Sequence, residues 1–352
     1  GVPYGGRGWY HSRTLLQPIG SGQNLRETTE GRWKIAALIL YPACVRLGFR
    51  WSGECVLLRL RCCYKAERGK PASEDGWLRV FISVDLEGIS GVVHEEHTRR
   101  DGKEHDRARR LMTGEANAAI SGAFEAGATE VVVNDSHGTM RNLVPEELHE
   151  DAKLITGSMK HLGMMQGVAE GFDAAFLVGY HARRGTLHGI LDHTYSGATV
   201  GSFVVNGQEL GETGMNAAIA GSFNVPIVLV TGDSAVTGEA RALLSDVETV
   251  TVKEAVSRRS AKCVHPNKAR QMIRQGAISA LKRRSEMRPF KLEPPFELRL
   301  ELMNAGMADA AELIPDVKRV APRVVAYTSD DFIKIYKAFQ ALVTLAASTI
   351  ER

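Results

Sequence analysis

Carboxylate and imidazole side chains follow three short apolar segments of the chain. Asp85 and Glu87 come after the first segment, and alternation along extended chain puts both on one side. His137 and His181 follow the next two segments, and Glu212 stands where a Gly-rich turn opens an Ala-rich helix. Carboxylates and imidazoles are zinc ligands, and a carboxylate that bridges two ions can help lower the pKa of a shared water. Together these five residues predict a two-zinc hydrolytic site.

The prediction depends on convergence, because any one of these residues is more often a core or surface residue without a ligand role. Two other interpretations stay open. A two-metal site could also act on another amide or on a phosphate ester. Alternatively, the chain could be a non-catalytic small-molecule or peptide binder in which these groups are structural.

The elements that must position these residues have the pattern of an α/β protein. Apolar strands are expected at 79–84, 130–134, 174–179 and 226–231, with a helix at 106–126 between the first two. Continuous apolar strands imply a parallel sheet covered on both faces, so residues 78–256 are expected to form a three-layer α/β/α catalytic domain. The carboxyl ends of such strands share one edge, where open sheets bind ligands.

A smaller α+β subdomain is expected over residues 257–352. Its strands are predicted at 296–302 and 323–327 and its helices at 308–314 and 331–347. This subdomain is expected to contribute to the cleft or to oligomerisation. The basic run at 282–284 is interpreted as a solvated helix face and turn.

Residues 1–77 differ in composition from the remainder of the chain. They hold 12 Lys and Arg against 6 Asp and Glu, whereas the remainder holds 32 against 35 and four of the five cysteines lie before residue 78. A slightly acidic body argues against nucleic-acid binding, and a single remaining thiol fits a cytoplasmic location. No apolar run is long enough for a membrane span. We interpret 1–77 as a poorly structured extension of artefactual origin; a lineage-specific extension and an organellar presequence are the alternatives.

Several polar residues near these motifs have more than one interpretation. Ser136 neighbours His137, but adjacent side chains of an extended segment point apart, which disfavours a serine mechanism. Asn134 and Asp135 are candidates for hydrogen bonds that orient a ligating imidazole. Asp233 could orient a ligand or the substrate amine, or cap a turn.

The motifs around these residues resemble those of the DppA-type zinc D-aminopeptidases. The resemblance is carried by Ser-Val-Asp-Leu-Glu-Gly-Ile-Ser-Gly at 83–91, Asn-Asp-Ser-His at 134–137 and Gly-Tyr-His-Ala at 179–182. Further matches are Gly-Glu at 211–212 with Gly-Met-Asn at 214–216, and Ser-Arg at 257–258. The matches keep their order over about residues 79–350.

This resemblance implies a zinc-dependent aminopeptidase with two zinc ions per chain and Asp85 as the bridging ligand. Glu87, His137, His181 and Glu212 complete the implied ligand set, and a metal-bound hydroxide is the implied nucleophile. His193 corresponds to a catalytic imidazole that does not ligate metal, with His188 as its rival. The implied substrate is a short peptide, with D-amino acids preferred, and the implied assembly is a ring-like homo-oligomer, a decamer.

Overall fold

The computed structural model of the protein describes residues 76–350. The predictions for the N-terminal extension therefore fall, up to residue 75, outside the described residues. The described residues belong to one compact unit, Pro71–Arg352.

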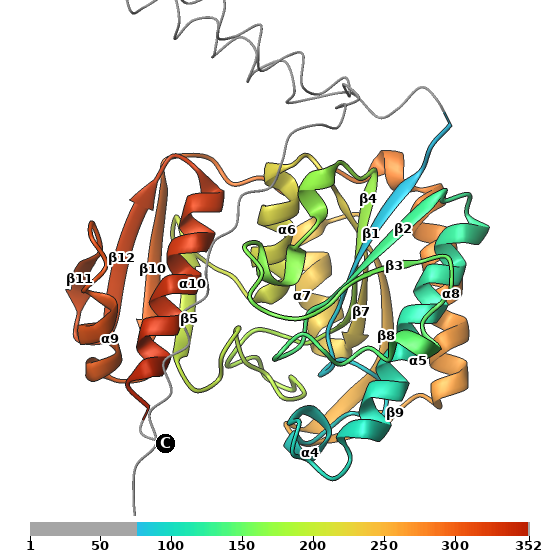
Figure 1. Ribbon diagram of the computed structural model, residues 1–352, viewed down its shortest axis with the longest axis horizontal. Coiled ribbons are helices and arrows are strands. Elements are labelled where there is room, and N and C mark those ends of the chain that lie inside the picture. The colour runs from blue at the N-terminus through green and yellow to red at the C-terminus, as the bar shows by residue number, and fades with distance from the viewer. Residues whose placement is uncertain (1–75, 351–352) are drawn as a thin grey trace, which may run out of the picture. The chain divides into compact units, whose positions relative to one another are not determined.

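A seven-stranded sheet forms the centre of this unit (Figure 1). Its spatial order is β3-β2-β1-β4-β7-β8-β9, and every neighbouring pair is parallel except β8 with β9. The strands are Arg79–Val84 (β1), Glu130–Asp135 (β2), Lys153–Ile155 (β3), Ala174–Tyr180 (β4), Ile227–Asp233 (β7), Glu248–Ser257 (β8) and Ser260–Cys263 (β9). Because β2, β1 and β4 are adjacent and parallel, their carboxyl ends lie side by side.

Helices cover both faces of this sheet (Figure 1). The four long ones are His105–Glu125 (α5) and Pro266–Lys282 (α8) on one face, and Glu212–Ser222 (α6) and Ser234–Leu244 (α7) on the other. Alternation along β1 divides its side chains: Val80 and Ile82 join the core under α5 and α8, whereas Phe81 joins the core under α6 and α7. The predicted three-layer α/β/α arrangement is therefore confirmed.

A second sheet of five antiparallel strands has the order β11-β12-β10-β5-β6. Its strands are Val200–Val205 (β5), Gln208–Glu209 (β6), Phe296–Leu302 (β10), Lys318–Ala321 (β11) and Val324–Ser329 (β12). Helices Ala305–Ala311 (α9) and Phe332–Ser348 (α10) cover it, and α10 also contacts α6. One hydrophobic core joins Phe203 of β5, Leu300 of β10 and Phe339 of α10 to Met215 of α6.

The division between the two sheets differs from the predicted boundary at residue 257. Strands β5 and β6 lie before that position in the sequence but pair within the second sheet. Strand β9 and helix α8 lie after it but belong to the first sheet and its core. Pairing between distant segments decides which sheet a strand joins, and local composition carries no signal of it.

The remaining helices are short. They are Glu95–Thr98 (α4) and the 3₁₀ turns Pro145–Glu147, Gly163–Met165, Val168–Glu170 and Arg284–Glu286. Within residues 76–350, no helix combines the length and the apolar character that crossing a membrane requires.

Candidate metal centre

The ends of β1, β2 and β4 bring the predicted ligand residues together. Asp85 and Glu87 follow β1, His137 follows β2 and His181 follows β4, so the three adjacent parallel strands deliver all four to one place. Glu212 opens α6 and reaches the same place from the segment that returns from the second sheet. The sequence predicted this convergence, and the strand order explains how it arises.

Asp85, Glu87 and His137 form the first group of ligand-type atoms. His137 Nδ1 lies 2.9 Å from Glu87 Oε2 and 3.3 Å from Asp85 Oδ1. The other ring nitrogen, Nε2, donates to the carbonyl oxygen of Thr98 at 2.9 Å. Because that bond places a proton on Nε2, the neutral, metal-binding form of the ring would point the lone pair of Nδ1 at the two carboxylates.

His181, His193 and Glu212 form the second group. His181 Nε2 lies 3.3 Å from Glu212 Oε1, and His193 Nε2 lies 3.8 Å from the same oxygen. His181 Nδ1 donates to the carbonyl of Ala182 at 3.0 Å, and His193 Nδ1 donates to the carbonyl of Leu191 at 2.9 Å. In the neutral form of each ring, which is the form that binds metal, the lone pair of Nε2 therefore points toward Glu212.

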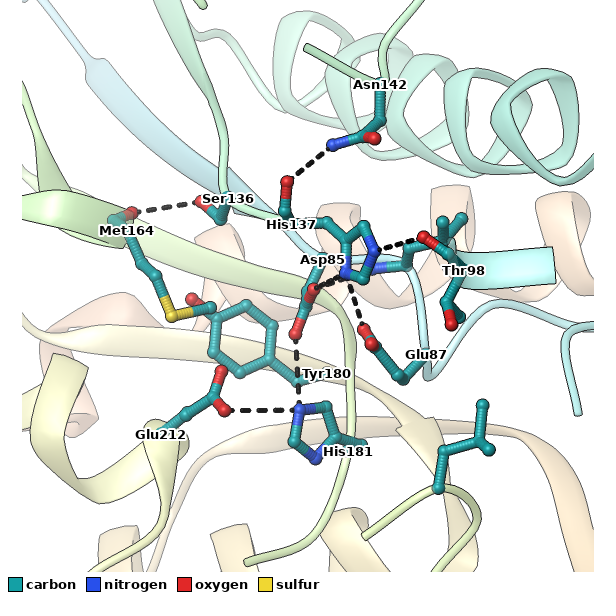
Figure 2. A network of polar contacts seen from close by, with 12 residues as sticks. Asp85, Glu87, Thr98, Ser136, His137, Asn142, Met164, Tyr180, His181 and Glu212 are labelled. Carbon is teal, nitrogen blue, oxygen red and sulfur yellow. Dashed lines mark hydrogen bonds and ion pairs between the residues drawn. The ribbon is translucent and has the colours of Figure 1, made fainter. Parts of the chain in front are cut away.

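Asp85 lies between the two groups and presents one oxygen to each (Figure 2). Its Oδ1 faces His137, whereas its Oδ2 lies 3.5 Å from His181 Nε2. The backbone N–H of Leu86 donates to Oδ1 at 2.8 Å and helps to fix the carboxylate plane. This is the geometry of a carboxylate that can bridge two cations.

Burial and mutual repulsion make the site favour positive charge. Burial, reinforced by the charge of Glu87, raises the pKa of Asp85 to about 7. Burial opposes protonation of His137, but the charges and hydrogen bonds of Glu87 and Asp85 together outweigh it and hold the pKa of His137 well above its usual range. Burial likewise opposes protonation of His181, but Glu212, together with the charges of Asp85 and Glu87, raises the pKa of His181 well above its usual range. A bound divalent cation would supply the charge that protons otherwise provide, and its affinity would depend on pH.

The chemistry of the donor set fits zinc. Three buried carboxylates and the available imidazole lone pairs match zinc's usual oxygen and nitrogen ligands. Among the described residues, His181 Nε2 is also a buried polar atom that makes no well-formed hydrogen bond, although carboxylate oxygens of Glu212 and Asp85 lie 3.3 Å and 3.5 Å away. A metal ion bound among these three atoms would give the buried nitrogen a partner.

His193 is close to the site and His188 is not. The ring of His193 stacks on His181 with centroids 4.1 Å apart and 12° between the planes. His188 is exposed and lies outside both groups of ligand-type atoms. Of the two imidazoles considered for a catalytic role, the fold therefore places His193 within reach.

The residues expected to orient the imidazoles act on the backbone instead. Asp135 accepts hydrogen bonds from the backbone N–H of Leu143 and from the side chain of Asn142, which itself donates to the His137 carbonyl. Asn134 donates to the carbonyl of Met164. The ring of His137 finds its partner in the Thr98 carbonyl, for which the sequence offers no signal because any residue carries a carbonyl.

Two other polar residues are explained by local structure. Ser136 Oγ lies 2.7 Å from Ser83 Oγ, in a buried polar network under the site. Asp233 caps α7 through the Val236 N–H at 2.8 Å and accepts from Ile190 N at 2.7 Å. The capping interpretation of Asp233 therefore holds.

Lys253 was missed by sequence reasoning. Its side chain is 1% exposed, and its ammonium donates to the carbonyls of Glu87, Ile89 and Val92, at 3.0 Å to Ile89 and 2.5 Å to Val92. It therefore fastens the loop that carries two of the ligand residues. A lysine that follows alternating threonine and valine residues along β8 is typical of a solvent-exposed strand position. The sequence pattern therefore gives no indication that Lys253 is buried or that it holds this loop.

A cavity of about 150 Å³ opens on this centre. It is lined by Asp85, Ser136, His137, Gly138, Met140, Met164, His193, Tyr195 and Glu212. Its lining thus combines carboxylates and imidazoles with two methionine side chains.

A family profile described as D-aminopeptidase matches residues 78–341. The chain belongs to the D-aminopeptidase family. Within this D-aminopeptidase family, a curated relative from Bacillus subtilis (strain 168), a "D-aminopeptidase", is 36% identical over 275 residues, covering 77% of this chain and 99% of the relative. A solved structure, described as the Zn-dependent D-aminopeptidase DppA from Bacillus subtilis, a self-compartmentalizing protease, matches with a TM-score of 0.76. It is 34% identical, and the match covers 78% of this chain and 100% of that one.

Proposed function

We propose that this chain is a zinc-dependent aminopeptidase that removes the N-terminal residue of short peptides, with D-amino acids preferred. The observation that carries the proposal is Asp85, whose two oxygens each face one group of ligand-type atoms. Membership of the D-aminopeptidase family and the similarity to a zinc-dependent relative support the chemistry and the stereochemical preference.

The residues that would hold two zinc ions are Asp85 as the bridge, Glu87 with His137 on one side, and His181 with Glu212 on the other. Zinc held there would polarise the scissile carbonyl and lower the pKa of an attacking water. The chain's own contribution is to keep the imidazoles in one tautomer through backbone carbonyls and to bury the carboxylates. Both reduce the reorganisation that binding and reaction require.

We propose that His193 transfers a proton to the departing amine through Nε2. Burial and the neighbouring His181 lower the pKa of His193, so its ring is neutral near pH 7. The Leu191 carbonyl keeps the Nδ1 proton in place, which leaves Nε2 free to take up a proton and pass it to the departing amine.

The finer features of the proposal concern assembly and location. The relative is described as self-compartmentalizing, which supports a homo-oligomer for this chain, and we propose a ring-like decamer. Light scattering of the purified full chain checks its mass. We also propose a cytoplasmic location, supported by the single cysteine after residue 77.

The deciding experiment measures zinc content and peptide hydrolysis on the full chain. Zinc-loaded protein should release N-terminal residues from a panel of D- and L-dipeptides, lose activity to a chelator and regain it with zinc. Asp85→Asn should bind less than half the zinc and lose more than about 100-fold in kcat/KM, since even supporting residues of metal sites cost 10- to 100-fold. Zinc-loaded wild type that cleaves a phosphate ester and no dipeptide would refute the proposal.

A further inference from the structure

The loop between β4 and β5, residues 181–199, carries His193 on an unusual backbone. Leu191 has φ of +52° and Tyr195 has φ of +60°. Residues other than glycine rarely adopt this left-handed conformation, which costs of order 1 kcal/mol or more and persists only where surrounding contacts impose it. The loop therefore needs a partner that holds its backbone.

The turn between β8 and β9 supplies that partner through one residue, Arg258. Its carbonyl accepts a hydrogen bond from the N–H of Leu191 at 3.0 Å. Its guanidinium donates from Nε to Asp192 Oδ1 at 2.7 Å and from Nη2 to the Asp192 carbonyl at 3.0 Å. Asp192 Oδ2 in turn accepts from the Gly185 N–H at 2.6 Å, which ties the two ends of the loop's turn together.

These contacts end at the imidazole of His193. The Leu191 carbonyl accepts from His193 Nδ1, and the ring stacks flat on His181 with Nε2 directed at Glu212. The orientation of Leu191 thus sets both the tautomer and the direction of the His193 ring. Arg258 binds Leu191 through its own backbone carbonyl and binds Asp192 through its guanidinium.

We propose that Arg258 is a positioning residue for His193, holding the β4–β5 loop so that His193 Nε2 faces the metal centre. The inference rests on the proposed function, in which His193 moves a proton. Arg258 contacts none of the ligand residues in the described part of the chain, and it reaches His193 through Leu191 and Asp192. Its Nη1 also lies 3.6 Å from Glu95 Oε1, an atom that Arg259 binds as well.

Removing the Arg258 guanidinium should change the position of His193 more than it lowers the stability of the fold. The ion pair is partly exposed, and such pairs contribute less than about 1 kcal/mol to stability. A loss of alignment is more costly for rate, since a shift of about 1 Å can cost roughly 100-fold. For Arg258→Gln in the full, zinc-loaded chain we expect kcat to fall roughly 10-fold, with KM and zinc content within about twofold of wild type.

The chain offers a matched control next door. Arg259 lies in the same turn and donates to Glu95 Oε1 at 2.6 Å, without contact to the β4–β5 loop. Arg259→Gln should therefore keep the wild-type kcat. Asp192→Asn should reproduce the loss seen in Arg258→Gln, and Arg258→Lys should retain part of kcat because it keeps one charge but loses the forked donor.

A double-mutant cycle distinguishes positioning from general damage. In a His193→Gln background, Arg258→Gln should cause no further loss of kcat, because the group it positions is already absent. In ¹⁵N-histidine NMR, the Nδ1-protonated signature of His193 should weaken in Arg258→Gln. An additive further loss of kcat, an unchanged NMR signature or an equal effect of Arg259→Gln would overturn the inference. Inactive zinc-loaded wild type would instead refute the proposed function.

Discussion

The buried carboxyl groups near the centre differ in what surrounds each of them. Burial alone would raise the pKa of Glu87 and of Glu212, but neighbouring imidazoles outweigh it and lower both values, to well below the usual range for Glu87. Glu115 has no such neighbour. It accepts from the Ser90 N–H at 2.9 Å through Oε1, and burial raises its pKa to about 7. Lys253 and Arg270 offset only part of that rise.

Glu115 should make stability depend on pH in a defined direction. Its folded pKa lies above the unfolded value, so its contribution is present below about pH 4.5 and is lost as pH rises through about 7. Glu115→Gln removes that loss while keeping an acceptor for Ser90. We expect equal stability near pH 4.5 and a variant more stable than wild type at pH 8, by up to about 3 kcal/mol.

Urea unfolding at several pH values checks the Glu115 prediction. Glu125→Gln is the control, since Glu125 lies on the same helix but pairs with Arg274 at the surface. A stability difference between Glu115→Gln and wild type that stays constant from pH 5 to 8 would contradict the prediction.

At the scale of elements, the loop after β1 is held from β8. The ammonium of Lys253 donates hydrogen bonds to three carbonyls of that loop, one of them the carbonyl of the ligand residue Glu87. Lys253→Met removes this donor from the carbonyls of Glu87 and Val92, at about 1–3 kcal/mol for each buried group left unsatisfied, whereas the Ile89 carbonyl keeps the N–H of Val92.

We expect Lys253→Met to bind zinc roughly 10- to 100-fold more weakly and to unfold at lower urea concentration. Competition with a chromogenic chelator measures the zinc affinity. Lys153→Met is the matched control, because Lys153 lies on β3 in an exposed ion pair with Glu130. Wild-type zinc affinity in Lys253→Met would show that the loop holds its shape without the ammonium.

The same loop approaches β4 so closely that only glycine fits at position 88. An added Cβ at Gly88 would clash with backbone carbonyl oxygens of Gly179 and Tyr180. Gly88→Ala should therefore destabilise the protein by more than about 2 kcal/mol and reduce zinc content. Gly238→Ala is the control, because Gly238 lies within α7 with open space around it. Alanine there should raise the free energy of unfolding by about 0.5–1 kcal/mol. Thermal melts of both variants test this, and a Gly88→Ala protein as stable as wild type would refute it.

At the scale of the molecule, the two sheets share one hydrophobic core. The chain between β4 and α6 crosses from the first sheet to the second, where its strand β5 pairs with β10, and then returns to the first sheet. Helix α10 contacts both β10 and α6. Residues 78–256 alone would lose the partner of β5 together with β9 and α8, which cover the core under α5.

We therefore expect a fragment of residues 78–256 to lack a cooperative fold. Removing α8 and α10 exposes large apolar surfaces that no remaining element covers. Near-UV circular dichroism and thermal melting compare this fragment with residues 76–352. A sharp melt and wild-type near-UV signal from the fragment would show that the first sheet folds independently.

The elements carrying the site were predictable because their signals are local. Strand β1 and strand β10 were predicted with the bounds that they have, and β2 and β4 to within one residue at their ends. Five ligand-type residues at strand and helix ends could be found for the same reason. Strands β5 and β6 and helix α8 could not be assigned to a sheet, since that depends on partners far away in the chain.

The amino-acid sequence alone shows which residue types stand at the carboxyl ends of the strands, because apolar runs define where each strand stops. That Asp85 faces both His137 and His181 follows from the fold, because β1 lies between β2 and β4. The tertiary structure also placed His193 rather than His188 at the centre. Contacts from the β8–β9 turn hold that loop, and the spacing of two histidines along the chain does not encode them.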